Sequence, residues 1–216
     1  MEAIPQVCIQ VRAYSVGASI APWMFYASLC LSIFTILKTI WERYQTPHDP
    51  ARDVETALKG LLEHGASPEL LRAHVQALVD ICSSNGALGK KVAEQGGLEL
   101  LLQCMRRYPE NHALTQTACM ALSAVCKKME GAQKAVEVGA IGDLLALVER
   151  KPPPKVVRFT LLSLRGIVSR DDDICKAAVE AGALPVVLGA MTQHRKDAAV
   201  QESGLDALAN IAGAGI

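Results

Sequence analysis

The chain has 216 residues, half of them apolar, and equal numbers of basic and acidic side chains, 22 of each. This length allows a substantial core, and the balanced charge gives no indication of nucleic acid binding. The seven cysteines form no CxxC pair and no Cys/His cluster at metal-ligand spacing. Their odd number favours a reducing compartment over a secreted disulfide framework.

The first predicted element is a transmembrane helix at residues 19–44, after a short N-terminal segment at residues 1–18. Residues 13–37 carry no charged side chain, and a helix of this length crosses a hydrocarbon core of about 30 Å. Aromatic residues flank the stretch, as at membrane interfaces: Trp23, Tyr26, Trp41 and Tyr44. The alternative is a buried helix that packs on the rest of the chain. A cleaved signal is disfavoured because no small-residue cleavage site follows.

Basic residues follow the predicted span closely, whereas Arg12 alone precedes it. By the positive-inside tendency, the rest of the chain lies on the cytoplasmic side, or on the matrix or stromal side of an organelle. Residues 12–15, Arg-Ala-Tyr-Ser, resemble a mitochondrial presequence cleavage site. This short match favours the mitochondrial inner membrane among the organelle membranes.

A linker at residues 45–52 leads to an amphipathic region at residues 53–216. Its first predicted helices span residues 53–64 and 68–83, with a turn between them. In that turn Ser67 is a natural helix cap, and Pro68 is a natural first helical residue.

Three later segments repeat one another: EQGGLELLL at 94, EVGAIGDLL at 137 and EAGALPVVL at 180, an interval of 43 residues each time. We expect each unit to contain a short helix that ends at Gly96, Gly139 or Gly182, then a second helix, then a longer third. A unit of this length cannot bury its own apolar face, so the units stack into an elongated helical solenoid.

The third helices carry a family resemblance. ALSAVC at 121–126, LRGIVS at 164–169 and ALANIA at 207–212 follow the same interval, and ALVDIC at 77–82 continues the series with one extra residue. This pattern resembles the armadillo repeat, with the HEAT repeat as the alternative. The resemblance covers residues from about 53 to 216 and implies an all-α, right-handed α-solenoid of about three full repeats and one partial repeat.

Armadillo proteins bind partners in a concave groove lined by the third helices. Carried over to this chain, the resemblance implies a partner-binding groove made of Gln76, Asp80, Met120, Ala124, Phe159, Ser163, Ile167, Glu202, Asp206 and Asn210. The last repeat alone keeps the asparagine of the family pattern, and the array lacks tryptophan, so it does not resemble the nuclear-import adaptors. The predicted middle of the floor is apolar and suits a helix or chain segment of a partner. A helical phase that differs by one residue would instead place Phe159 and Met120 in the core.

Catalytic and metal sites are not predicted. The chain has no phosphate-binding glycine loop, no His-Glu-x-x-His and no nucleophile elbow, and its histidines are scattered. Asp171–Asp173 is better explained as a helix cap than as a metal site, and residues 151–155 as a stiff loop rather than a polyproline ligand. We therefore expect no cofactor, no metal and no small-molecule substrate.

The sequence predicts a non-catalytic, membrane-anchored scaffold that serves as an accessory or assembly subunit of a larger membrane complex. The alternative is a membrane-tethered adaptor that recruits soluble client proteins, and an enzyme with a hidden active site is the third class. The final helix is apolar, and no charged residue follows Asp206. We therefore expect residues 205–216 to contact either a further repeat or another subunit.

Overall fold

The computed structural model describes residue 26 and residues 29–38, 50–62, 67–168 and 171–213. The chain divides into two units, Met1–Asp49 and Pro50–Ile216. Within the described ranges the ordered elements are α-helices, and no strand occurs.

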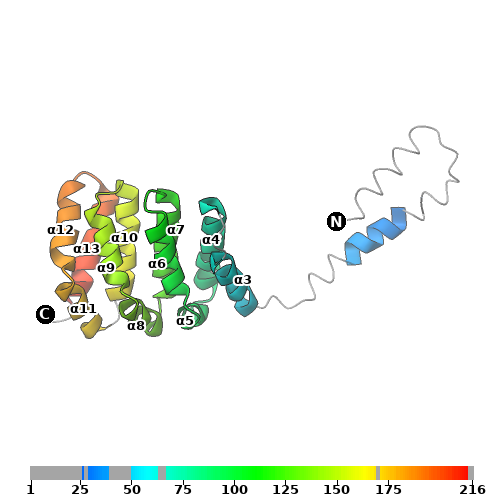
Figure 1. The fold of residues 1–216 in the computed structure, drawn as a ribbon, viewed down its shortest axis with the longest axis horizontal. Coiled ribbons are helices and arrows are strands. Elements are labelled where there is room, and N and C mark those ends of the chain that lie inside the picture. Colours follow the sequence, from blue (N-terminus) through cyan, green and yellow to red (C-terminus); the bar gives the residue numbers. More distant parts are fainter. Residues whose placement is uncertain (1–25, 27–28, 39–49, 63–66, 169–170, 214–216) are drawn as a thin grey trace. The chain divides into compact units, whose positions relative to one another are not determined.

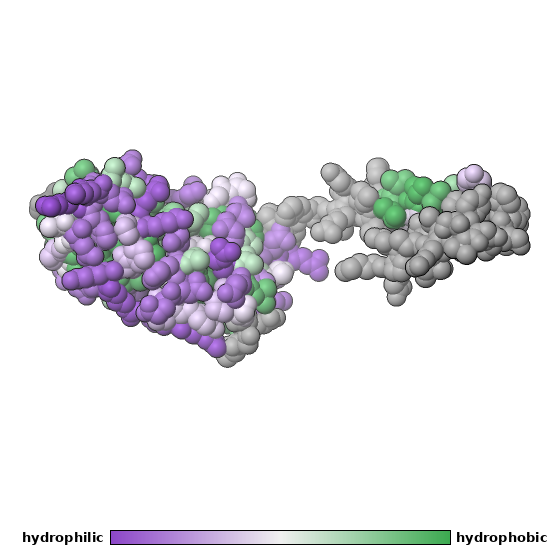
Figure 2. All heavy atoms as spheres, turned by 90° about the horizontal axis from the view of Figure 1, so that it is seen from above, coloured by the Kyte–Doolittle hydropathy of each residue, from purple (hydrophilic) through white to green (hydrophobic). Residues whose placement is uncertain are grey.

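In the first unit the structure describes one apolar helix, Leu29–Lys38. Most of its large apolar side chains are exposed, and Figure 2 shows them as a green patch. Leu31 and Phe34 are each 67% accessible. Most of the remaining predicted span at 19–44, and most of the predicted linker, lie outside the described residues. Among the residues that are described, no single helix is both long and apolar enough to cross a membrane, although the bent pair Asp172–Glu180 and Ala183–Gln193 meets the criteria of length and composition.

The second unit is a stack of helices (Figure 1). A partial first repeat contains α3 (Pro50–Leu62) and α4 (Pro68–Ser84). Three full repeats follow, each with a short, a middle and a long helix: α5 (Ala87–Glu94), α6 (Gly97–Arg107) and α7 (His112–Val125); α8 (Met129–Glu137), α9 (Ala140–Glu149) and α10 (Pro154–Val168); α11 (Asp172–Glu180), α12 (Ala183–Gln193) and α13 (Ala198–Ala212). This order of elements confirms the predicted all-α solenoid with its partial first repeat.

The predicted helix ends have the expected geometry. Gly96, Gly139 and Gly182 adopt left-handed backbone conformations with φ of 78°, 78° and 86°, which lets the chain reverse between the short and the middle helix. The Ser67 hydroxyl accepts a hydrogen bond from the Leu70 backbone N–H at 3.3 Å, as a cap of α4. Asp171 caps α11 in the same way, accepting from the Asp173 N–H at 2.7 Å.

The core forms where repeats stack on one another. The long helices α4, α7, α10 and α13 pack in series, each against the next, and in Figure 1 they stand side by side. Leu78, Leu122 and Leu164 occupy equivalent positions on successive long helices, and all are buried. The buried core side chains come from Val54 to Ile211, so this unit has a continuous core of its own.

The short helices approach the long ones closely because glycine faces them. A Cβ atom built on Gly131 of α8 would lie 2.3 Å from the Val125 carbonyl oxygen of α7, and one on Gly89 of α5 would lie 2.9 Å from the same atom. Any larger residue at Gly131 would push α8 away from the preceding repeat.

Two glycines near the start of α9 separate the effect of backbone conformation from that of packing. A Cβ added at Gly139 or at Gly142 meets nothing within 4 Å, but Gly139 alone has a positive φ. We predict that Gly139→Ala lowers the free energy of unfolding by about 1–2 kcal/mol. The control, Gly142→Ala, raises it by about 0.4–1 kcal/mol because alanine loses less entropy in a helix. Urea denaturation measures both, and equal changes in the two variants would contradict the assigned turn.

Candidate protein-binding surface

The outward faces of the four long helices form one surface, which we call the third-helix surface. Gln76, Met120, Leu162 and Asp206 share one repeat position on α4, α7, α10 and α13, and each is exposed or half-buried. One helical turn later, Asp80, Ala124, Gly166 and Asn210 share the next position. Each repeat therefore has two equivalent positions along this surface.

The spacing within the repeats is not constant. The core leucine of the long helix follows the turn glycine by 26 residues in two repeats, from Gly96 to Leu122 and from Gly182 to Leu208, but by 25 from Gly139 to Leu164. The connection from α9 to α10 is thus one residue shorter than its equivalents. In α10 every equivalent residue comes one position earlier than a uniform interval of 43 predicts.

This shift corrects part of the predicted groove. Ser163 and Ile167 are 0% exposed, so their prediction as groove residues is wrong. The Ser163 hydroxyl donates to the Cys119 carbonyl at 2.6 Å, inside the junction between α7 and α10. Ala124 is also buried, at 4% exposure, on α7, which packs between α4 and α10.

The other predicted residues lie nearer the solvent. Gln76, Asp80, Met120 and Glu202 are exposed, and Phe159, Asp206 and Asn210 are half-buried. The one-residue shift does not by itself account for the half-burial of Phe159 at the edge of the surface. There the Arg158 guanidinium lies 5.5 Å from the centre of the Phe159 ring. Whether these residues bind a partner stays a prediction.

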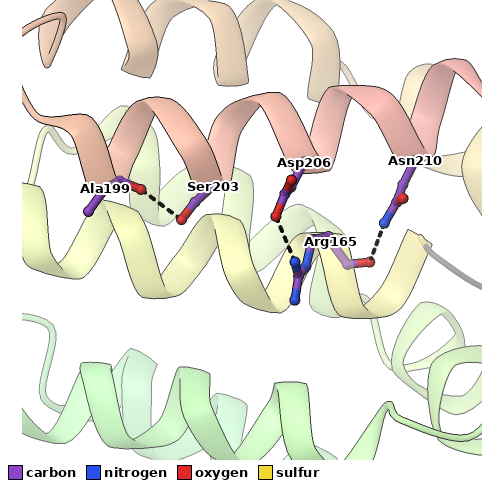
Figure 3. Close-up of polar contacts among 5 residues, drawn as sticks. All are labelled: Arg165, Ala199, Ser203, Asp206 and Asn210. Carbon is purple, nitrogen blue, oxygen red and sulfur yellow. Dashed lines mark hydrogen bonds and ion pairs between the residues drawn. The ribbon is translucent and has the colours of Figure 1, made fainter.

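Three polar groups meet where α10 and α13 adjoin (Figure 3). The Arg165 guanidinium donates to the Asp206 carboxylate at 2.6 Å, and the Asn210 amide nitrogen donates to the Arg165 carbonyl at 3.4 Å. Both side chains of the ion pair are 44% exposed. The pair therefore contributes only about 0–1 kcal/mol to stability, and its side chains can exchange partners at low cost.

A hollow of about 330 Å³ opens beside this ion pair, and we call it the polar hollow. Its lining comes from three long helices and from the turn after α7: Ser123, Lys127, Arg165, Gly166, Asp206, Ala209 and Asn210. The hollow exists because Gly166 has no side chain where the next repeat has Asn210. A Cβ on Gly166 would lie 3.4 Å from the Ser123 hydroxyl. The polar hollow can accept a hydrogen-bonding or charged group of a partner.

A uniform interval of 43 residues does not identify the residues that α10 exposes on the third-helix surface. Arg158, Leu162 and Arg165 are exposed or half-buried on its outer face. Comparing the distance from each turn glycine to the next core leucine would have identified them. With Lys127 in the turn after α7, they make the centre of the third-helix surface apolar and basic, while Asp80 and Glu202 lie on the first and last long helices, α4 and α13.

A second hollow, of about 1020 Å³, lies between the middle helices α9 and α12. At the preceding junction, the Arg106 guanidinium of α6 donates twice to the Asp143 carboxylate of α9, at 2.6 and 3.1 Å. The equivalent residues at α9 and α12 are Glu149 and Val186, which cannot form such a pair and instead line the hollow. The junction between α9 and α12 therefore lacks the ion pair that joins α6 to α9.

The buried thiols lack the properties of nucleophiles. Burial raises the pKa of Cys82 and Cys119 to about 11 and that of Cys126 to about 12, so these side chains stay protonated at neutral pH. In the described part of the chain, no group of three or more His, Cys, Asp or Glu side chains could hold a metal ion.

Comparisons with known proteins agree with this architecture. Among curated proteins, the chain is similar to Armadillo repeat-containing protein 6 of Homo sapiens and of Pongo abelii, with 28% identity over 130 residues in each case. The match covers 56% of this chain and 26% of each relative, so the chain spans about a quarter of the length of the curated relatives it matches. No protein-family model matches the chain.

Solved structures of engineered proteins are also similar. One has a TM-score of 0.67 and 27% identity over 74% of this chain and 62% of its own. Another has a TM-score of 0.64 and 26% identity over 78% of this chain and 70% of its own. Together with the curated relatives, they support an armadillo-like α-solenoid. Such a repeat fold supports a non-catalytic role in protein interaction.

Two substitutions on α10 test the corrected phase. Ile167→Glu buries an unpaired carboxylate, and we predict a loss of more than about 4 kcal/mol of stability, enough to unfold a marginal array. Leu162→Glu is the control, because its half-buried side chain can turn to solvent, and we expect a loss of less than about 1.5 kcal/mol. Thermal unfolding followed by circular dichroism compares them. A larger loss of stability for Leu162→Glu than for Ile167→Glu would instead support the uniform interval of 43 residues.

Proposed function

We propose that this protein is a non-catalytic scaffold that binds a protein segment along its third-helix surface. The observation that carries the proposal is the composition of that surface at its centre. Met120 and Leu162 occupy equivalent positions on neighbouring helices, and Met120 is 36% exposed although the described residues of the array bury most of their large apolar side chains. Apolar side chains that stay in contact with solvent at one repeated position favour a bound partner.

The charges around these two residues indicate what the partner carries. Lys127, in the turn after α7, and Arg158 of α10 are exposed, and Arg165 is held by an exposed ion pair in which a partner's carboxylate can replace Asp206. A segment with apolar residues flanked by acidic ones fits this centre. Asparagine at 210 offers a side-chain amide to the backbone of such a segment.

A peptide selection tests this proposal. Peptides that bind the full-length chain are selected from a random displayed library, and their affinities are measured by fluorescence anisotropy. We predict that the selected peptides are rich in apolar and acidic residues. Leu162→Glu weakens them by tenfold or more, which corresponds to about 1.4 kcal/mol, and raised salt weakens binding further because part of it is electrostatic.

Ala146→Glu is the matched control. It likewise replaces an apolar residue by a carboxylate, here at the exposed Ala146 of the middle helix α9. Peptides that lose affinity equally in both variants, or in neither, would show that the third-helix surface is not the binding site.

We further propose that residues 19–44 anchor the scaffold in a membrane as a subunit of a membrane complex. Two observations favour this: residues 13–37 carry no charge, and helix Leu29–Lys38 exposes large apolar side chains. The basic residues that follow the segment favour an array on the cytoplasmic side, or on the matrix side of a mitochondrial inner membrane. A tethered adaptor for soluble clients is the alternative. Its clients would leave on salt washing, whereas complex subunits would remain at fixed ratio.

The anchor is tested by extraction with alkaline carbonate. We predict that the full chain stays with the membrane pellet and that Leu31→Glu combined with Phe34→Glu moves it to the supernatant, since charged side chains are costly in hydrocarbon. The core of the array starts at Val54, so both forms should unfold at the same temperature. Retention of the double variant in the pellet would contradict the anchor and leave the peptide-binding proposal untouched.

A further inference from the structure

Both ends of the array present apolar positions that are buried at every internal junction. A solenoid offers an internal reference for this comparison because each junction repeats the same contacts. Side chains at equivalent positions can therefore be compared from one long helix to the next.

At the α13 end, two leucines are exposed. Leu188 of α12 is 51% exposed, whereas the equivalent Leu145 and Leu102 are 5% and 1% exposed under the following repeat. Leu205 of α13 is 59% exposed, and its equivalents on α10, α7 and α4 are all buried: Leu161, Cys119 and Val75. No described residue covers these two side chains as the next repeat covers their equivalents.

At the α4 end, the opposite side of the same junction is open. Leu70 is 46% exposed, whereas the equivalent residues on α7, α10 and α13 are buried: Leu114, Val156 and Val200. Ala77 and Ile81 are half-buried, and their equivalents are buried as well. None of the residues named for either end carries a charge.

The internal junctions show how the two faces fit. At the α7–α10 junction, Cys119 lies against Ser163, whose hydroxyl donates to its carbonyl at 2.6 Å. Leu205 is the equivalent of Cys119, and Ala77 is the equivalent of Ser163. Small Ala77 opposite large Leu205 preserves the complementarity of a junction where both residues are of intermediate size.

We propose that the two exposed ends of the array form an interface between copies of the chain, with the α12–α13 end of one copy stacked on the α3–α4 end of the next. The contact would continue the internal junctions and remove Leu70, Leu188 and Leu205 from water. Such an interface is heterologous, so it does not close on itself in a dimer and each added copy offers a new free end. It would also carry the third-helix surface from α13 of one copy to α4 of the next.

Complementary variants of the full chain in detergent micelles test this interface. Leu70→Glu blocks one end and Leu205→Glu blocks the other, and because both residues are exposed, neither change disturbs the core. Light scattering after size exclusion should show concentration-dependent assembly of the wild type and a single copy for each variant alone. An equimolar mixture of the two variants should double the protein mass, because one intact end of each remains.

Ala146→Glu on α9 is the control and should assemble like the wild type. Self-association through the apolar N-terminal segment would persist in every variant, and it would contradict the proposal. A dimer formed by Leu70→Glu alone would point to like ends pairing, and a wild type that stays a single copy at all concentrations would also overturn the head-to-tail contact. None of these results bears on the binding of peptides to the third-helix surface.

Discussion

The stacking of repeats on one another is the constraint on which this structure depends. A short helix, a middle helix and a long helix bury too little surface to be stable alone, so each unit needs its neighbour. The left-handed glycines make this possible by reversing the chain between the first two helices, and the small residues facing Val125 let the short helices come close. The same constraint leaves the outward faces of the long helices free for other uses.

The one-residue shortening between α9 and α10 decides the chemistry of that free surface. It turns Ser163 and Ile167 into the core and brings Leu162, Arg158 and Arg165 outward. It also places Gly166 where the last repeat has Asn210, which opens the polar hollow. A change in loop length by one residue thus gives the middle of the floor, expected to be apolar from uniform spacing, an apolar and basic character.

Much of the fold was predictable because its signals are local. Turn glycines, the Ser67 cap and the Asp171 cap depend on a few adjacent residues, and all three kinds of signal agree with the structure. The orientation of α10, which decides which of its residues face the core, does not follow from such local signals. It depends on the length of the connection before the helix rather than on the helix itself. The segments LRGIVS and ALSAVC can be aligned plausibly either at the uniform interval of 43 residues or with a shift of one residue. Burial of Ile167 at 0% exposure decides between them. The predicted transmembrane helix lies largely outside the described residues, so it remains a proposal.

The proposed scaffold role requires that a protein partner binds at the third-helix surface. Hydroxyl-radical footprinting with mass spectrometry tests this most directly, because methionines report on several faces of one chain. Met120 lies on the surface at 36% exposure, Met105 is buried at 7%, and Met129 and Met191 lie half-buried on α8 and α12. The account predicts that a bound partner slows the oxidation of Met120 severalfold and leaves the rates of Met129 and Met191 unchanged. An unchanged rate at Met120, with protection at Met191 instead, would place the partner on the other side of the array and contradict the account.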